Sequence, residues 1–410
     1  MKTPHFFVTC AALAAWVSSL AAALPTVRWD AKIVQGENYE LAFPFEVTGD
    51  GDAVAGSFFN GEIPVSSTGG SLKDNQLQLE FAHYGNTLKA TLENGVLKGS
   101  YGNEQRGFKP FEARPQVAPA PNPPQIGGVW TIPTESEKGE KAWSLIVRQE
   151  GGKVFAAINR IDGDTGSIDG IWTGERFALQ KFDGARGYTL DITPAADGSL
   201  ALALRSSATR PASKLTALRP EVATSRGLPP PNDPLNHLRI KNPDEPFRFS
   251  FPDLNGKIVS NDDPRFQGKV VVIAVGGSWC PNCHDEAPFL KEIYAKYRAL
   301  GLEVVSFSFE EAAQLPEAKR LRAYIKKYDL NFTYLLGGDR KEVNAKLPQV
   351  ENLNVWPASF VLGRDGRVRA THAGFAAPAT GELHQELRRD FIATIEKLLA
   401  ESAPKVTVSL

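Results

Sequence analysis

The sequence predicts a multidomain protein in which an all-β part, built as a meander, sandwich or barrel, precedes an α/β domain. Short stretches that alternate apolar and polar residues fill the first half, for example Leu77–Phe81 and Tyr188–Ile192, and this alternation is typical of half-buried strands. Asn94-Gly95 and Asp197-Gly198 favour tight hairpins between such strands. In the last third, continuous apolar runs alternate with helical stretches, which is typical of α/β domains.

The all-β part contains a predicted internal duplication. Residues Ser71–Tyr101 and Ile168–Leu204 both run through a strand ending in Phe, a Gly turn, a second strand and an Asn-Gly or Asp-Gly turn. The spacing of about 100 residues predicts two β-rich repeats, residues 26–114 and 125–220, joined by a Pro-rich stretch. The alternative is that two unrelated β meanders share this pattern. If the repeats are half-barrels, together they could close into one barrel.

A second Pro-rich linker, residues 221–238, leads to an α/β domain over residues 239–403. Its apolar runs predict buried strands at 270–275, 304–309 and 332–336, and its amphipathic stretches predict helices. The helices are expected at 281–300, 317–328 and 381–399, and hairpins at 247–259 and 359–371.

Composition excludes several classes of protein. Of 410 residues 42% are hydrophobic, which indicates a globular chain. The 46 basic and 47 acidic residues leave a net charge of -1, which argues against nucleic-acid binding or an anionic membrane surface as partner. The three cysteines, Cys10, Cys280 and Cys283, are too few for a disulfide-stapled scaffold or a four-cysteine zinc site.

The N-terminus predicts export. Lys2 precedes an uncharged run from Phe6 to Leu24, and Ala21-Ala22-Ala23 offers a small-residue cleavage site, so residues 1–23 are expected to be a signal peptide cut after Ala23. The alternative is a retained N-terminal anchor. We therefore expect the mature protein in a bacterial periplasm or cell envelope, without Cys10 and with Cys280 and Cys283 as its only cysteines.

The motif Trp279-Cys280-Pro281-Asn282-Cys283 follows a predicted buried strand and opens a predicted helix. Pro281 suits the first helical position, which places Cys280 at the N-cap, where free N–H groups and the helix dipole favour a thiolate. Cys283 lies one turn further on and is expected to be more buried. Cys280 would attack a disulfide and Cys283 would resolve the mixed disulfide.

Two further features accompany the motif. Trp356-Pro357 precedes a predicted strand, and a proline in such a place is either cis or an ordinary edge proline. His284, in the first turn of the predicted helix, is expected to be solvated rather than catalytic.

Residues 249–399 resemble the TlpA/ResA-like thiol-disulfide oxidoreductases, a thioredoxin-fold group of the AhpC/TSA redoxin superfamily. The residues that match its motifs are Trp279, Cys280, Cys283, Glu286, Pro288 and Pro357. The resemblance implies a thioredoxin fold, a redox-active Cys280–Cys283 disulfide as the only redox group, and no metal or other cofactor. It also implies that Glu286 assists proton transfer and that Pro357 lies beside the cysteine pair. Protein disulfides would be the substrates, in contact with Trp279, Pro281 and Trp356, and a membrane thiol carrier would be the electron donor.

Departures from the group leave alternatives open. Pro281-Asn282 replaces the more usual X-Pro between the cysteines, so the pair could be more oxidising than a typical reductase. Glu286 could instead be a first-turn acid that favours the helix N-terminus. The alternative functions are a thiol peroxidase of the AhpC/TSA type, although Cys280 stands where that group has Thr, and a binding module with an accessory redox domain.

Overall fold

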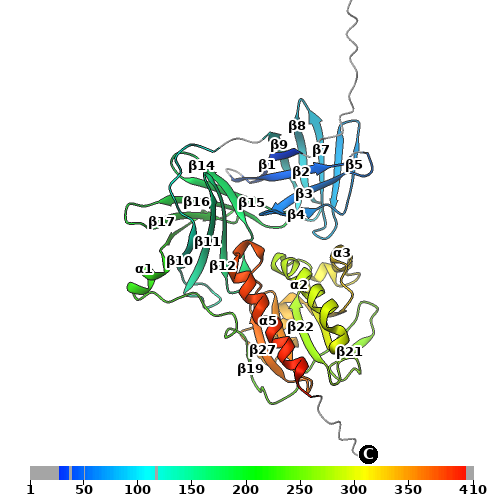
Figure 1. Ribbon diagram of the computed structural model, residues 1–410. Helices are drawn as coiled ribbons and strands as arrows, with labels where there is room; N and C mark the ends of the chain where they lie inside the picture. The colour runs from blue at the N-terminus through cyan, green and yellow to red at the C-terminus, as the bar shows by residue number, and fades with distance from the viewer. Residues whose placement is uncertain (1–26, 37–38, 50, 116–118, 403–410) are drawn as a thin grey trace, which may run out of the picture.

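The structure is a computed structural model, and it describes residues 27–36, 39–49, 51–115 and 119–402 (Figure 1). The predicted signal peptide, residues 1–23, and Cys10 lie outside the described residues. Figure 1 shows two β-rich units above a C-terminal domain of mixed helices and strands. In the described part of the chain, no helix is both long enough and apolar enough to cross a membrane.

The first β-rich unit, called barrel 1, is an antiparallel sheet of nine strands in the order β4-β3-β2-β1-β9-β8-β7-β6-β5. In β6 the buried side chains of Leu77, Leu79 and Phe81 alternate with exposed polar ones, as the sequence predicts. The sheet curls over this core until the Leu72 amide of β5 donates a 2.7 Å hydrogen bond to the Gly51 carbonyl before β3. The strands are β1 (Val27–Gly36), β2 (Tyr39–Thr48), β3 (Ala55–Asn60), β4 (Ile63–Ser66), β5 (Gly69–Lys73), β6 (Gln76–Phe81), β7 (Asn86–Glu93), β8 (Val96–Asn103) and β9 (Gly107–Pro115).

The second unit, called barrel 2, has the strand order β10-β11-β12-β14-β15-β16-β17-β18, with β13 paired to β12. Thr131 of β10 and Leu218, which follows β18, exchange two backbone hydrogen bonds of 2.7 and 2.9 Å, so the sheet closes on itself. The strands are β10 (Gly128–Pro133), β11 (Ala142–Glu150), β12 (Lys153–Arg160), β13 (Gly163–Asp164), β14 (Ile168–Trp172), β15 (Phe177–Phe182), β16 (Gly187–Pro194), β17 (Leu200–Arg205) and β18 (Ser213–Ala217), and the short helix α1 (Pro220–Ser225) follows.

Each β-rich unit encloses its own hydrophobic core, around Phe45 and Phe58 in barrel 1 and around Ile158 and Leu190 in barrel 2. The expectation that two half-barrels close into one barrel is therefore wrong, because each sheet has enough strands to cover its own apolar face. Three consecutive strands in each unit, β6–β8 and β15–β17, occupy the stretches with the matching sequence pattern. The duplication itself stays a prediction.

The C-terminal domain has the thioredoxin topology, a five-stranded mixed sheet in the order β24-β23-β22-β26-β27. Strand β22 is buried along its whole length because it is covered on both faces. Its Val270 and Val272 pack with helices α2, α3 and α5, and its Val271 and Ile273 pack with the segment around Phe249 and Leu347. The strands are β19 (Arg239–Ile240), β20 (Ser250–Pro252), β21 (Ile258–Ser260), β22 (Val270–Gly276), β23 (Leu302–Glu310), β24 (Thr333–Asp339), β25 (Val350–Glu351), β26 (Ala358–Leu362) and β27 (Val368–Ala373).

The helices of this domain begin and end close to the predicted positions. Within α5, Leu387, Phe391, Ile395 and Leu398 are buried on one stripe, as their spacing predicts. Strand β24 is three residues longer than predicted at its C-terminal end. The α-helices are α2 (Pro281–Tyr297), α3 (Lys319–Tyr328), α4 (Val343–Lys346) and α5 (Glu382–Ala400), and the 3₁₀ turns are Arg298–Leu300, Ala312–Gln314, Arg340–Glu342 and Pro378–Thr380.

Candidate functional site

The two cysteines lie where strand β22 meets helix α2. Cys280 is the N-cap residue with an extended backbone, and its Sγ accepts a 3.2 Å hydrogen bond from the amide of Cys283. Pro281 occupies the first helical position, where its missing N–H removes no helical hydrogen bond. The cysteines are joined as a disulfide with their Cα atoms 5.3 Å apart. The sequence of this turn therefore places one sulfur at the N-terminus of the helix and the other one turn inside it.

Two glycines let the chain pass closely behind the cysteines. A Cβ atom on Gly276 would lie 2.9 Å from Cys283 Sγ. A Cβ atom on Gly277 would lie 2.5 Å from the carbonyl oxygen of Phe309 in the neighbouring strand. Larger residues at either position would push the motif away from the sheet.

A buried ionic network holds the residue before the motif. Glu310 accepts hydrogen bonds of 2.7 Å from both the amide and the hydroxyl of Ser278. Arg320 of α3 donates to the same hydroxyl at 2.9 Å and pairs with Glu310 at 3.3 Å. Both charged side chains are buried, so the network fixes the loop leading to Cys280.

His284 is buried, so the expectation of a solvated side chain is wrong. Its Nε2 donates to the Ser278 carbonyl at 2.9 Å, since a carbonyl can only accept, and its Nδ1 lies 3.1 Å from the hydroxyl of Tyr328. Burial lowers the pKa of His284 to about 3, which keeps the ring neutral. The ring of Tyr84 from barrel 1 lies 5.0 Å away, and the ring of Tyr324 lies 4.7 Å away, so part of the cover over His284 comes from outside its own domain.

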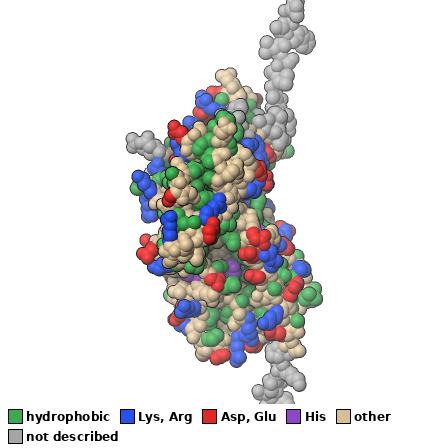
Figure 2. Space-filling model, turned by 60° about the vertical axis from the view of Figure 1, so that its left-hand side comes forward, with side chains coloured by type: hydrophobic (Ala, Val, Ile, Leu, Met, Phe, Trp, Pro, Cys, Tyr) green, Lys and Arg blue, Asp and Glu red, His purple; other side chains and the backbone are tan. Residues whose placement is uncertain are grey.

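Both sulfurs are buried, with Cys280 2% exposed and Cys283 5% exposed. The expectation that Cys283 is the more buried of the two is wrong. Residues of barrel 2 lie opposite Cys280, across the cleft that both line. Figure 2 shows the two halves of the molecule in close contact, with histidine side chains visible at their junction.

Barrel 2 makes direct hydrogen bonds to Asn282, the second of the two residues between the cysteines. Asn282 Nδ2 donates to the Asp162 carbonyl at 2.7 Å, and Arg186 Nη1 donates to Asn282 Oδ1 at 2.9 Å. Asp164 of the same barrel accepts a 2.6 Å hydrogen bond from the amide of Ala377 in the C-terminal domain. Asn282, which differs from the residue usual at this place in the motif, therefore has a structural role, because its side chain binds barrel 2.

Arg186 is the centre of a buried charge cluster between barrel 2 and helix α2. It pairs with Asp183 at 2.8 Å within the barrel and with Asp285 at 3.1 Å across the junction. Burial alone would raise the pKa of Asp183, but Arg186 and Lys181 outweigh it and hold that pKa well below its usual range. The positive and negative charges in this buried interface are therefore balanced, and removal of one partner would destabilise the folded state.

Glu286 lies deep behind the cysteines. It is buried, its Oε1 accepts a 2.9 Å hydrogen bond from the hydroxyl of Ser359, and burial raises its pKa to about 7. A cavity of about 10 Å³, enough for about one water molecule, is lined by Glu286, Cys283 and Ser306 among others. A carboxyl that titrates near neutral pH next to a sulfur can accept or release a proton there. The alternative of a first-turn acid that favours the helix N-terminus does not fit, because Glu286 is buried and lies beyond the first turn of α2.

Trp279, Pro281 and Trp356 form one wall of a cleft at Cys280, and Pro357 follows Trp356 in the chain. The Trp356-Pro357 bond is cis, and Pro357 leads into β26, which pairs with β22, the strand that ends before the cysteines. The rings of Trp279 and Trp356 are 5.3 Å apart in an edge-to-face arrangement. Together with Pro281 and Cys280 they line a space of about 290 Å³ whose other wall is barrel 2.

Sequence reasoning did not identify the residues that barrel 2 contributes. Arg186 follows an Asp-Gly turn like many others, and nothing in its local sequence relates it to a motif almost a hundred residues further on. Glu310 had a usable signal, because an acidic residue at the end of a predicted buried strand must find a partner.

Comparison with known proteins gives matches to the C-terminal domain. The AhpC/TSA family model matches residues 243–371. The thiol-disulfide oxidoreductase ResA of Bacillus thuringiensis subsp. konkukian is 30% identical over 122 residues, which are 29% of this chain and 62% of that protein. The thioredoxin-like protein YneN of Bacillus subtilis is 30% identical over 142 residues, 35% of this chain and 76% of that protein. The chain thus spans less than two thirds of the length of this ResA relative.

Among solved structures, a putative thiol:disulfide interchange protein DsbE from Chlorobium tepidum is similar, with 25% identity and a TM-score of 0.30. The match covers 38% of this chain and 99% of that one.

Proposed function

The chain belongs to the thioredoxin-like family of YneN and ResA, and from this membership we propose that it is an exported thiol-disulfide oxidoreductase that reduces disulfides in protein substrates. The single observation that carries the proposal is the geometry of the cysteine pair: Cys280 caps helix α2, Cys283 lies one turn inside it, and the two are close enough to form a disulfide. Export is supported by the N-terminal sequence, with its uncharged run and small-residue cleavage site.

The reaction transfers two electrons from the reduced pair to the substrate. The Cys280 thiolate attacks one sulfur of the substrate disulfide, which forms a mixed disulfide and releases the first substrate thiolate. Cys283 then loses its proton to the Glu286 carboxylate and attacks Cys280 Sγ, which forms the Cys280–Cys283 disulfide and releases the second substrate thiolate. The two substrate thiolates take up protons, one of them by way of Glu286. A thiol carrier in the membrane is the proposed donor that reduces the pair again.

The turnover of single-cysteine variants tests this proposal. With dithiothreitol as electron donor and a model protein disulfide as substrate, Cys280→Ser should abolish reduction. Asn331→Ala, at an exposed position of the same domain, is the control and should leave reduction intact. Turnover that survives the loss of Cys280 would contradict the proposal. Consumption of hydrogen peroxide that needs Cys283 but not Cys280 would instead favour a thiol peroxidase.

The direction of electron flow has its own test. Equilibration of the pair with glutathione buffers measures its reduction potential. A reductase requires a potential more negative than about -180 mV, which is the value typical of a protein disulfide isomerase. A value near that of a strong oxidant, about -120 mV, would show that the pair donates disulfides instead.

A further inference from the structure

The cleft at Cys280 has two walls of different origin. Trp279, Pro281 and Trp356 of the C-terminal domain form one, and Arg160 and Tyr188 of barrel 2 are among the residues that form the other. Because Cys280 is only 2% exposed, a substrate disulfide must reach it through this space of about 290 Å³. The volume of this space is close to the lower limit for ligand pockets, about 300 to 1,000 Å³. The space therefore admits an extended peptide rather than the surface of a folded domain.

Three cations line the cleft, and two of them are already neutralised. Lys138 is paired with Asp162, and Arg186 is paired with Asp183 and Asp285.

The side chain of the third cation, Arg160, has no ion pair and no hydrogen bond to any residue that the structure describes, and its Nε is buried. A buried donor without a partner is uncommon and costs stability. Arg160 is therefore the cation of this cleft that is free to bind an anionic group.

The fold holds Arg160 in place at the mouth of barrel 2. Along β12, Val154, Ala156 and Ile158 point into the barrel core, so alternation directs Arg160 inward at the end of the strand. Its guanidinium group lies over the ring of Trp143, 4.7 Å from the ring centre. A guanidinium fixed on an aromatic face keeps its N–H donors available, and their planar arrangement matches a carboxylate.

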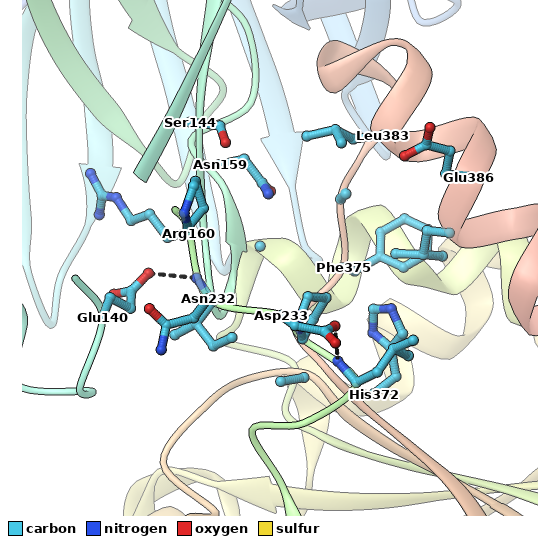
Figure 3. Close-up of a pocket in the computed structure, with 18 of the residues that line it drawn as sticks. Glu140, Ser144, Asn159, Arg160, Asn232, Asp233, His372, Phe375, Leu383 and Glu386 are labelled. Atoms are coloured by element: carbon cyan, nitrogen blue, oxygen red, sulfur yellow. Dashed lines mark hydrogen bonds between the residues drawn. The ribbon is translucent and has the colours of Figure 1, made fainter. Parts of the chain in front are cut away.

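The space continues beyond Arg160. A second pocket of about 280 Å³ shares Arg160 and Gly163 with the cleft. Figure 3 shows Ser144, Asn159 and Arg160 on the barrel side of this pocket, opposite Phe375 and Leu383 of the C-terminal domain. The two pockets together give an extended chain a path from Cys280 along the junction between the domains.

The second pocket is lined by the acidic residues Glu140, Asp233, Glu386 and Asp390, so an anionic group of the substrate fits at Arg160 and not further along this path. We propose that barrel 2 selects the substrate, and that Arg160 binds a carboxylate next to the cysteine of an extended peptide segment. The inference rests on the proposed function, because it assigns the substrate class of the same cysteine pair. The electron transfer is the one given above, from the reduced pair to the substrate disulfide.

The test uses the full-length, reduced protein and three disulfide-linked peptides of equal length. The cysteine is flanked by Glu in the first, by Gln in the second and by Lys in the third. The ratio of kcat/KM for the Glu peptide to that for the Gln peptide is measured in the wild type and in Arg160→Gln. Because flanking charges also change the reactivity of the disulfide itself, the change in this ratio between the two proteins is the readout.

We expect the ratio to fall roughly tenfold in Arg160→Gln, which is the loss of one charge-assisted hydrogen bond. The Lys peptide should be the poorest substrate of the wild type and should improve relative to the Gln peptide in the variant. Arg148→Gln, which removes an exposed cation of the neighbouring strand, is the matched control and should keep the wild-type ratio.

Equal ratios in the wild type and Arg160→Gln would overturn the inference and leave the proposed function standing, provided that the Gln peptide is reduced. Failure of the reduced protein to act on any of the three peptides or on a model protein disulfide would overturn both.

Discussion

The side chain of Asn282, between the two cysteines, donates a 2.7 Å hydrogen bond to the backbone carbonyl of Asp162 in barrel 2. A β-barrel is thus bound to the motif itself rather than tethered beside it. Cys280, at the N-cap of α2, is buried, and the cleft that leads to it has barrel 2 as one wall. Access to the cysteine pair therefore depends on contacts between two domains.

Loosening this contact should expose Cys280. Asn282→Ala removes the hydrogen bonds to Asp162 and Arg186, and we expect the reduced protein to be alkylated at Cys280 roughly tenfold faster, because one or two bonds of this kind hold the barrel in place. The measurement is the rate of iodoacetamide labelling at Cys280. Asn331→Ala, at an exposed position of the same domain, is the control and should not change the rate. An unchanged rate in Asn282→Ala would show that the barrel does not limit access.

The ion pair across the junction should be strongly coupled. Arg186→Met leaves the buried Asp285 without its cation and Asp183 with Lys181 alone, so we expect the free energy of unfolding in urea to fall by about 3 kcal/mol. Adding Asp285→Asn to Arg186→Met should cost less than the sum of the two single changes. Arg389→Met, which breaks an exposed pair with Glu382, should cost less than about 1 kcal/mol. Additive effects at Arg186 and Asp285 would contradict the structure of this cluster.

The pH dependence of resolution should follow Glu286. Burial raises the pKa of this carboxyl to about 7, so the carboxylate that accepts the Cys283 proton is formed as the pH rises through 7. We expect the rate of mixed-disulfide resolution to rise over the same range, and Glu286→Gln to lower that rate and remove the inflection. Glu292→Gln, on the exposed side of the same helix, should keep it. An unaltered pH profile in Glu286→Gln would show that Glu286 has no part in the proton transfer.

The same carboxyl should affect stability with a defined sign. Because its folded-state pKa is raised from 4.5 to about 7, Glu286 favours the folded state least at high pH, where the buried group must be charged. Glu286→Gln should therefore be more stable than the wild type at pH 8, by up to about 3 kcal/mol, and should gain little at pH 4.5. A gain that is equal at both pH values would contradict the raised pKa.

Local patterns in the sequence predicted the parts of the structure that local physics decides. The alternation around Leu79 gives a strand, Asn94-Gly95 gives a hairpin, and Pro281 after Cys280 gives a helix start with a sulfur at its cap. The cis bond before Pro357 is also one of the two conformations that the sequence allowed.

The parts that could not be predicted depend on contacts between domains. His284 looks like a solvated first-turn residue until barrel 1 and Tyr328 cover it. Arg160 is the last residue of an ordinary strand, and only the structure shows that it lines the same cleft as Cys280. Hydrophobic periodicity reports which face of an element is buried, but it does not report which distant polar side chain lies opposite.

Mass spectrometry of a trapped intermediate tests directly whether Cys280 attacks the substrate disulfide. Reduced Cys283→Ser protein is mixed with a disulfide-containing protein substrate, and the products are digested and mapped. We expect a covalent adduct joined through Cys280, which dithiothreitol releases and which Cys280→Ser does not form. An adduct that persists in Cys280→Ser, or the absence of any adduct while the wild type still reduces the substrate, would contradict it.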